Sequence, residues 1–204
     1  HSTAQPQDFN DLYAPGVEIA PPGSFEASFQ LPLVIDLDDD GDDEVIFTAS
    51  KVDNESPGKL FIFGNDDAGL FVDRTEHFIP GGFGPLTAVV RQFVPADFNG
   101  DGRIDLFMED HGHETDCGPN PPACWTVGVN RLLLSDKNGQ WADRTDTHLP
   151  SDFSDFSHGS AAGDFDGDGH IDIWVNNGGS GWPDFPYMLR NNGIGEFAVV
   201  ADFS

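Results

Sequence analysis

The sequence predicts an all-β fold, and within that class a β-propeller segment of about three four-stranded blades. Two observations lead to this prediction. An acidic loop recurs three times along the 204 residues, starting at Asp36, Asp97 and Asp164, at intervals of 61 and 67 residues. Each loop runs into a short apolar stretch of β type (VIF, LFM or IWV), after which the rest of the unit also repeats.

The three loops share one nine-residue pattern: an acid at position one, an acid or amide at three, an acid at five, glycine at six and an acid at nine. Position seven varies in type and would offer only its backbone carbonyl. Such oxygen-only, flexible ligation suits Ca²⁺ better than Mg²⁺. The predicted ligands of three Ca²⁺ ions are Asp36, Asp38, Asp40, Asp42 and Glu44 in loop one (36–44); Asp97, Asn99, Asp101, Arg103 and Asp105 in loop two (97–105); and Asp164, Asp166, Asp168, His170 and Asp172 in loop three (164–172).

Two other interpretations of the loops were weighed. An EF-hand needs a bidentate Glu at position twelve between two helices, but that position holds Phe47, Met108 and Val175 within β-type runs, which excludes it. Metal-free Asp/Gly turns are the second interpretation. Because three copies keep their acids in the same register, metal sites are favoured over metal-free turns. Glu44 departs from the Asp that the other two loops have at position nine, so loop one fits least well.

The rest of the repeat supplies the other strands. Third strands are predicted at 59–65, 131–136 and 187–192, and fourth strands begin at the aromatic residues Phe71, Trp141 and Phe197. Each acidic loop then joins the first two strands of a blade. The predicted blades are 24–75, 76–145 and 146–204, together one propeller domain or part of one. Residues 1–23 are predicted to hold the last strand of a preceding blade, so we expect the missing blades in another fragment, another chain or a symmetric copy.

These residues resemble a known family. The loop D-x-D/N-x-D-G-x-x-D with its apolar strand, and the later N-x-G-x-G-x-F of Asn191 to Phe197, are similar to the FG-GAP/VCBS-type repeats of integrin α-like propellers. The resemblance covers roughly residues 24 to 201. It implies a calcium-binding propeller in a secreted or extracellular protein, and it is much less specific for any activity.

Composition excludes two classes of partner. The formal charge is −27 and only nine residues are Lys or Arg, so a nucleic-acid ligand is not expected. No run of 18 or more apolar residues is present, so no membrane span is predicted. Hydrophobic residues make up 38% of the chain and 18 of them are Phe, which predicts a packed interior.

The face opposite the acidic loops carries the long connections 109–127 and 176–186. Cys117 and Cys124, the only cysteines, are predicted to form a disulfide there, which would indicate an oxidising compartment. A zinc site with His111 and His113 is the alternative.

Two further groups on this face were considered. A transition-metal or acid–base site, as opposed to a polar surface loop, would use His111, His113, Glu114, Asp116 and His158. An aromatic platform for sugar rings, as opposed to packing between blades, would use Trp125, Trp182, Phe185 and Tyr187.

Two functions follow from these features. The first is an extracellular calcium-binding module for adhesion, recognition or assembly, with a protein or glycan ligand on the face opposite the loops. The alternative is a carbohydrate-active enzyme, such as a polysaccharide lyase, on a calcium-stabilised propeller. Outside the repeat positions the sequence shows no recognisable paired carboxylates, nucleophile elbow or phosphate loop, so the module is favoured.

Overall fold

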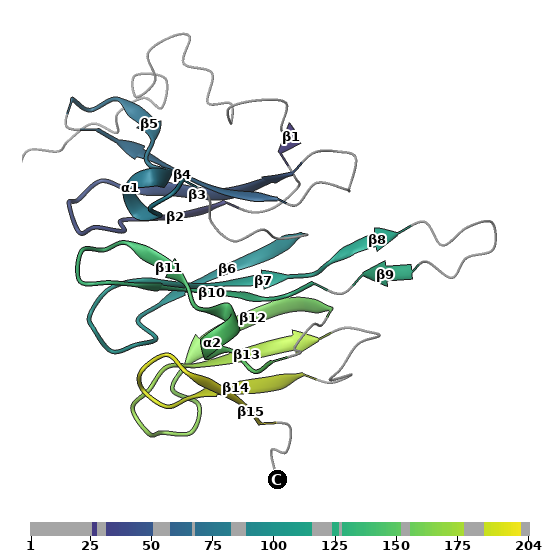
Figure 1. The fold of residues 1–204 in the computed structure, drawn as a ribbon. Coiled ribbons are helices and arrows are strands. Elements are labelled where there is room, and N and C mark those ends of the chain that lie inside the picture. The colour runs from purple at the N-terminus through teal and green to yellow at the C-terminus, as the bar shows by residue number, and fades with distance from the viewer. Residues whose placement is uncertain are drawn as a thin grey trace, which may run out of the picture.

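A computed structural model describes residues 26–27, 32–50, 58–66, 68–82, 89–115, 124–126, 128–151, 156–177 and 186–200. Within these ranges the chain forms three antiparallel sheets that stack one on another (Figure 1). The only helices described are two short turns, α1 (Thr75–Phe78) and α2 (Thr145–His148). The predicted all-β, propeller-like segment of about three blades is therefore confirmed.

Each sheet is one blade with its strands in sequence order. Blade one contains β2 (Leu33–Ile35), β3 (Glu44–Ser50), β4 (Lys59–Asn65) and β5 (Phe71–Asp73), and the short β1 (Glu26–Ala27) pairs with the far end of β3. Blade two contains β6 (Val90–Ala96), β7 (Asp105–Asp110), β10 (Arg131–Ser135) and β11 (Trp141–Asp143). Blade three contains β12 (Ser157–Gly163), β13 (Asp172–Asn177), β14 (Tyr187–Asn191) and β15 (Phe197–Val200).

The predicted strand positions agree with these elements. The third strands lie where the apolar runs placed them, and the fourth strands begin at Phe71, Trp141 and Phe197. Each of these aromatics pairs with the last residue of the third strand, which is Asn65, Ser135 or Asn191. One ribbon departs from the repeat: β8 (His113–Thr115) pairs with β9 (Cys124–Thr126) between β7 and β10.

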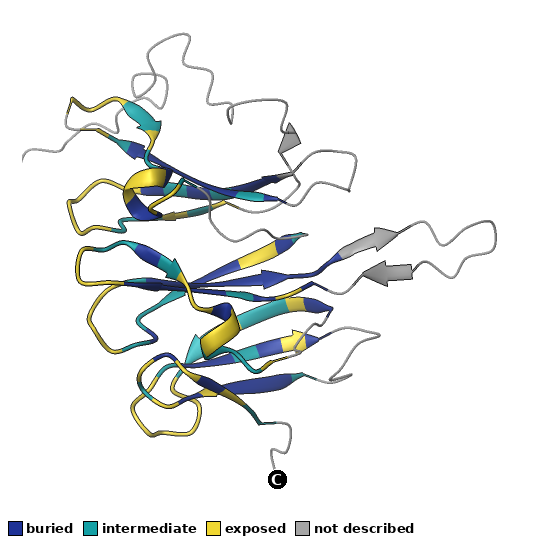
Figure 2. Ribbon diagram, viewed as in Figure 1, coloured by how far each residue is buried: buried dark blue, intermediate teal, exposed yellow. Residues whose placement is uncertain are grey.

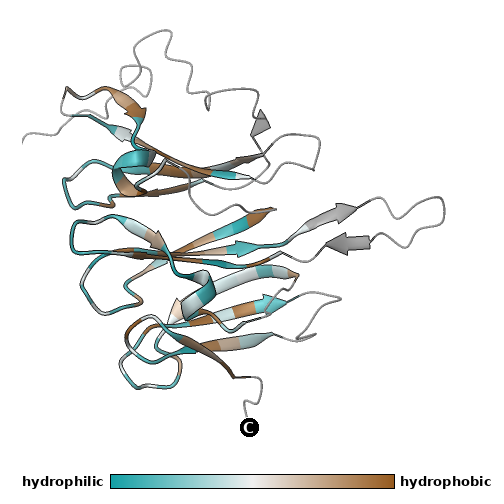
Figure 3. Ribbon diagram, in the orientation of Figure 1, coloured by the Kyte–Doolittle hydropathy of each residue, from teal (hydrophilic) through white to brown (hydrophobic). Residues whose placement is uncertain are grey.

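Strand β7 of blade two is buried on both faces because its sheet lies between two others. Along β7, Leu106 and Met108 belong to the core cluster shared with blade one, whereas Phe107 belongs to the cluster shared with blade three. Side chains alternate between the faces of a strand, so an unbroken apolar run serves both clusters. Figures 2 and 3 show the consequence, with buried, hydrophobic strands and exposed, hydrophilic connections.

A D-R-T motif closes two of the blades in the same way. The Asp73 carboxylate accepts a hydrogen bond from the Thr75 backbone N–H (2.9 Å), and Thr75 Oγ1 accepts one from the Ile62 N–H (2.9 Å). The equivalent contacts in blade two join Asp143, Thr145 and Leu132. The motif therefore ties the turn after strand four back to strand three, and it leaves the side chain of the central arginine free to point elsewhere.

The residue at position two of each loop packs against the next blade. Leu37 packs against the cluster between blades one and two. Phe98 is 1% exposed and meets Phe197 of blade three edge-on, with ring centroids 5.7 Å apart. Phe165 has the same position in blade three, where no further sheet is described, and it is 49% exposed.

Phe98→Ala should therefore destabilise the fold by about 3 kcal/mol or more, because it removes a buried ring and leaves a cavity between two blades. Phe165→Ala, at the equivalent position, should cost about 1 kcal/mol or less in the isolated chain. Urea denaturation followed by tryptophan fluorescence measures both. Equal losses for the two variants would contradict the packing of position two against the following blade.

Candidate metal centres

The three acidic loops lie along one edge of the stack, where they connect β2 to β3, β6 to β7 and β12 to β13 (Figure 2, at left). This is the predicted placement between the first and second strands of each blade. Most residues at the loop tips are exposed, whereas the residue at position nine is the first of the second strand and is buried in every loop. The loops therefore begin at the surface and end in the core.

One hydrogen-bond network recurs in all three loops. The position-one Asp accepts a bond from the N–H of the glycine at position six, at 3.0 Å in loop one, 2.8 Å in loop two and 3.0 Å in loop three. The position-five Asp accepts one from the N–H of residue seven, at 2.9, 3.0 and 2.9 Å. Residue seven thus contributes its backbone to the fold of the loop, which explains why Asp, Arg and His are all found there.

Two residues in each loop have a left-handed backbone. The glycine at position six has φ between 83° and 93°. Position four also has positive φ, with Gly100 at 74°, Gly167 at 79° and Asp39 at 60°. Among the described residues Asp39 is the only non-glycine in this region, and Asp is one of the few side chains that tolerate it. Sequence reasoning identified the turn at position six and missed the one at position four, which Gly100 and Gly167 indicated.

The acid at position nine ties the loop to the third strand. One oxygen of Asp105 accepts the Phe98 N–H (2.9 Å), and the other accepts the backbone N–H (2.7 Å) and hydroxyl (2.9 Å) of Ser135. Asp172 bonds in the same way to the N–H groups of Phe165 (3.1 Å) and Asn191 (2.9 Å). Ser135 and Asn191 were not predicted as part of the site, although each lies within a predicted third strand.

Burial shifts the protonation of this acid. Removal from water raises the pKa of Asp105 above its usual value, because desolvation disfavours the charged carboxylate. The hydrogen bonds from Ser135, Phe98 and Asn99 act in the opposite direction, since they stabilise the charge. A cation held in the loop would favour the ionised form in the same sense as these donors.

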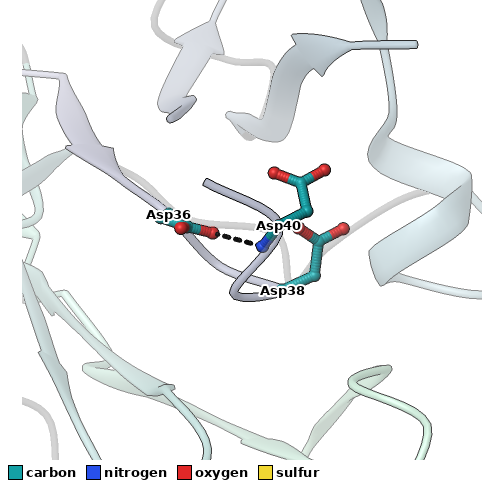
Figure 4. Close-up of side chains that lie close together, drawn as sticks. All are labelled: Asp36, Asp38 and Asp40. Carbon is teal, nitrogen blue, oxygen red and sulfur yellow. Dashed lines mark hydrogen bonds between the residues drawn. The ribbon is translucent and has the colours of Figure 1, made fainter. Parts of the chain in front are cut away.

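The side-chain oxygens at the loop tips converge. Oxygens of Asp36, Asp38 and Asp40 lie within 4.8 Å of one another in loop one (Figure 4), as do those of Asp164, Asp166 and Asp172 in loop three. This separation is about twice the Ca²⁺–oxygen bond length of roughly 2.3–2.6 Å, so one ion between such oxygens is geometrically reasonable. The donors are all carboxylates, which suits a hard cation.

Within loop two, Arg103 lies 3.6 Å from Asp101. Arginines from outside the loops contact loops one and three, and neither of these contacts was predicted. In loop three, Arg190 lies 2.5 Å from Asp166 and 3.3 Å from Asp168, but its own side chain is 52% exposed. The pKa of Asp168 is lowered, first by the hydrogen bond from the His170 N–H and then by Arg190. In loop one, Arg74 contacts Asp38 and Glu44, each at 3.0 Å, and is far less exposed.

His111 and His158 lie together across two blades, as considered from the sequence, with ring centroids 4.7 Å apart. His111 is buried, and its Nε2 lies 3.2 Å from a guanidinium nitrogen of Arg91. Because Arg can only donate, Nε2 is the acceptor and is committed to Arg91. Burial, followed by the charge of Arg91, lowers the pKa of His111. Burial and the Arg91 contact therefore both favour the uncharged form of His111.

The remaining residues of the opposite face have different outcomes. Tyr187 is fully buried in the cluster between blades two and three, with its hydroxyl 3.3 Å from Asn130 Nδ2, so for this residue the alternative of packing between blades is confirmed. Cys117, Asp116, Trp182 and Phe185 lie outside the described residues, and for Cys124, His113, Glu114 and Trp125 only the backbone is described. The Cys117–Cys124 disulfide stays a prediction.

Asp105→Asn should lower the free energy of unfolding by about 2–4 kcal/mol in the presence of EDTA. The amide keeps one acceptor oxygen and turns its NH₂ towards buried N–H donors, which then lose their partner. Asp101→Asn removes the same charge from an exposed position of the same loop and should cost less than about 1 kcal/mol. Chemical denaturation compares the two, and a similar loss for both would refute the structural role of position nine.

Among the described residues no helix is long and apolar enough to cross a membrane. Comparison with curated proteins gives no significant match. A family model for the FG-GAP-like repeat matches residues 36–108 and 123–175, which together are more than half of the chain and include all three acidic loops. The matched segments contain the loop, the buried acid and the following strand in each blade. The chain belongs to the FG-GAP-like repeat family.

Proposed function

We propose that this chain is an extracellular β-propeller module for adhesion, recognition or assembly, stabilised by Ca²⁺ in its acidic loops. The observation that carries the proposal is the convergence of carboxylate oxygens from Asp164, Asp166 and Asp172 within 4.8 Å, on a loop already folded by its own backbone hydrogen bonds. Membership of the FG-GAP-like repeat family supports a module of this type.

The carboxylates of loop one also converge, but Arg74 contacts them, so loops two and three are taken first. The residues that would hold it are Asp97, Asn99, Asp101, the carbonyl of Arg103 and Asp105 in loop two, and Asp164, Asp166, Asp168, the carbonyl of His170 and Asp172 in loop three. Bound calcium would supply a double positive charge among carboxylates that otherwise repel one another. The chain's own N–H groups hold the oxygens in place, which reduces the ordering that binding requires.

Calcium binding would stabilise the fold by a modest amount. Extracellular modules bind Ca²⁺ with dissociation constants of about 10⁻⁴–10⁻³ M. At about 1 mM calcium each site would then add roughly 0.4–1.4 kcal/mol. Two sites together would raise the melting temperature by several degrees in a chain of this length. The ion would therefore act mainly by stiffening the loop edge of the blades.

The end of the stack opposite the loops is the proposed recognition surface, with a protein or a glycan as ligand. It is separate from the metal loops, and it carries the feature that breaks the repeat, the β8–β9 ribbon. The His111–His158 pair lies towards the same end of blades two and three, at or near the ends of β7 and β12 away from the acidic loops. Non-repeated surface on a repeated scaffold is where binding specificity is usually found.

Calcium titration followed by NMR should shift the amide signals of Gly102 and Gly169, since each donates to the position-one Asp of its loop. Asp101→Ala and Asp168→Ala should each abolish the response of one loop only. Arg103→Ala should leave both responses intact, because the ion would use only the backbone carbonyl of this residue. No shift of either glycine, with melting unchanged by EDTA, would reduce these loops to metal-free turns.

We also propose that a further blade of the same type covers the outer face of blade three. Phe98 is buried by blade three, whereas Phe165, its equivalent, is half exposed. On the same face Arg190 and Ala198 are exposed, and the Phe165 ring lies against Gly163 of β12. A fourth blade would bury Phe165 as blade three buries Phe98, and it would cover the sheet that lies at the end of the stack.

Light scattering of the chain alone should show self-association, because in such a sample a second copy is the source of further blades. Phe165→Asp should weaken this association. Leu70→Asp, at an exposed apolar residue of the turn between β4 and β5, is the control for the effect of adding a surface charge. A monodisperse 22.1 kDa monomer at all concentrations, fully folded in calcium, would argue against completion by a second copy.

A further inference from the structure

The surroundings of loop one differ from those of the other two loops in three residues that contact one another. Position nine is Glu44, where the other loops have Asp, and the third strand has Gly64 where blades two and three have Leu134 and Arg190. The third residue is Arg74, whose side chain turns inward. The sequence indicated the first departure only. The contacts among the three residues show that these departures belong together, with Glu44 on β3, Gly64 on β4 and Arg74 directly after β5.

Glu44 makes one of the two contacts that the position-nine acid makes in the other loops. Its Oε2 accepts the Leu37 N–H at 3.0 Å, as Asp105 and Asp172 accept the N–H of position two in their loops. Its Oε1 accepts a guanidinium N–H of Arg74 at 3.0 Å, where Asp105 and Asp172 bond instead to the last residue of the third strand. The extra methylene of Glu carries this oxygen to Arg74.

Gly64 provides the room for this pair. A Cβ at position 64 would lie 2.6 Å from Glu44 Oε1, which is too close, and 3.2 Å from Arg74 Cδ, which is tight. In blade two the equivalent residue is Leu134, which is buried towards blade three. Arg144, the equivalent of Arg74, has the same backbone hydrogen bond to the third strand at 2.8 Å, yet its side chain is exposed. The space left by Gly64 is thus what admits Arg74.

The Arg74 guanidinium lies among the carboxylates that would otherwise hold an ion. Its second nitrogen is 3.0 Å from Asp38 Oδ2, and the first is 4.0 Å from Asp40 Oδ2 as well as 3.0 Å from Glu44. The side chain is 17% exposed, and its charged carbon lies 5.1 Å from the centre of the Phe78 ring. Arg190, which contacts loop three from β14, has a side chain three times as exposed as that of Arg74 and bonds to Asp166 and Asp168 but to no position-nine acid, so it can move aside.

We propose that Arg74 is the permanent counterion of loop one, so that this loop folds without a divalent cation and the chain binds Ca²⁺ in loops two and three only. A dication beside Asp38 and Asp40 would be repelled by a guanidinium that already bonds to the same residues. To leave, Arg74 would have to abandon a fully buried Glu44 carboxylate, and a buried charge without its partner is strongly unfavourable. This inference rests on the proposed calcium function and narrows it from three sites to two.

An NMR titration of the full chain with CaCl₂ tests the number of sites. The amides of Gly102 and Gly169 should shift at millimolar calcium, whereas that of Gly41 in loop one should not. In Arg74→Gln the Gly41 amide should become responsive, while Arg144→Gln, the equivalent change in blade two, should behave as wild type. A Gly41 response in the wild type at the same calcium concentration as the other two glycines would overturn the proposal.

Two measurements keep the test decisive if Arg74→Gln folds poorly. Asp40→Ala is the position-five change in an exposed residue and should leave the calcium-induced rise in melting temperature unchanged, whereas Asp101→Ala should remove about half of it. An equal loss for both would overturn the proposal. In EDTA, Arg74→Gln should lower the melting temperature by about 5–10 °C and Arg144→Gln should not.

The EDTA comparison separates this proposal from the calcium function itself. If Gly102 and Gly169 do not respond to calcium, the proposed function fails, but the counterion role of Arg74 still predicts the difference between the two arginine variants. If the two variants melt together in EDTA, Arg74 is a surface ion pair of little energetic weight and the counterion role is refuted.

Discussion

The structure depends on one carboxylate in each blade, the buried acid at the start of the second strand. Its two oxygens bond in opposite directions, one to the backbone of the acidic loop and the other to the end of the third strand or, in blade one, to Arg74. A charge is tolerated there only because donors converge on it from both sides. Residues inside the blade therefore determine the shape of the loop and of any ion site within it.

Much of the fold could be predicted because its signals are local or periodic. The loop pattern, the β-type runs and the aromatic that begins each fourth strand lie close together in the sequence, and their spacing repeats. The alternation that buries both faces of β7 requires an unbroken apolar run, which the sequence also displays. Backbone conformation at Asp39 was harder to foresee, because only the glycines of the other two loops indicated it.

The contacts that were missed join residues about twenty to thirty positions apart. Glu44 meets Arg74, and Asp105 meets Ser135, only because the register of three strands brings their ends together. Periodicity predicts that strands exist but not which side chain reaches into a space that another residue leaves empty. Gly64 is informative in this respect: its identity has meaning only once the neighbours that a Cβ would strike are known.

Blade two shares a core cluster with each neighbouring sheet, and this has a consequence for how the molecule opens. Separating its strands would break both clusters at once, whereas the outer strands of blades one and three can part from the stack with only one cluster affected. Amide hydrogens of β7 and β10 should therefore exchange with solvent only when the whole chain unfolds, and those of β5 and β15 through smaller, local openings. The middle sheet makes the unfolding of three similar units a single cooperative event.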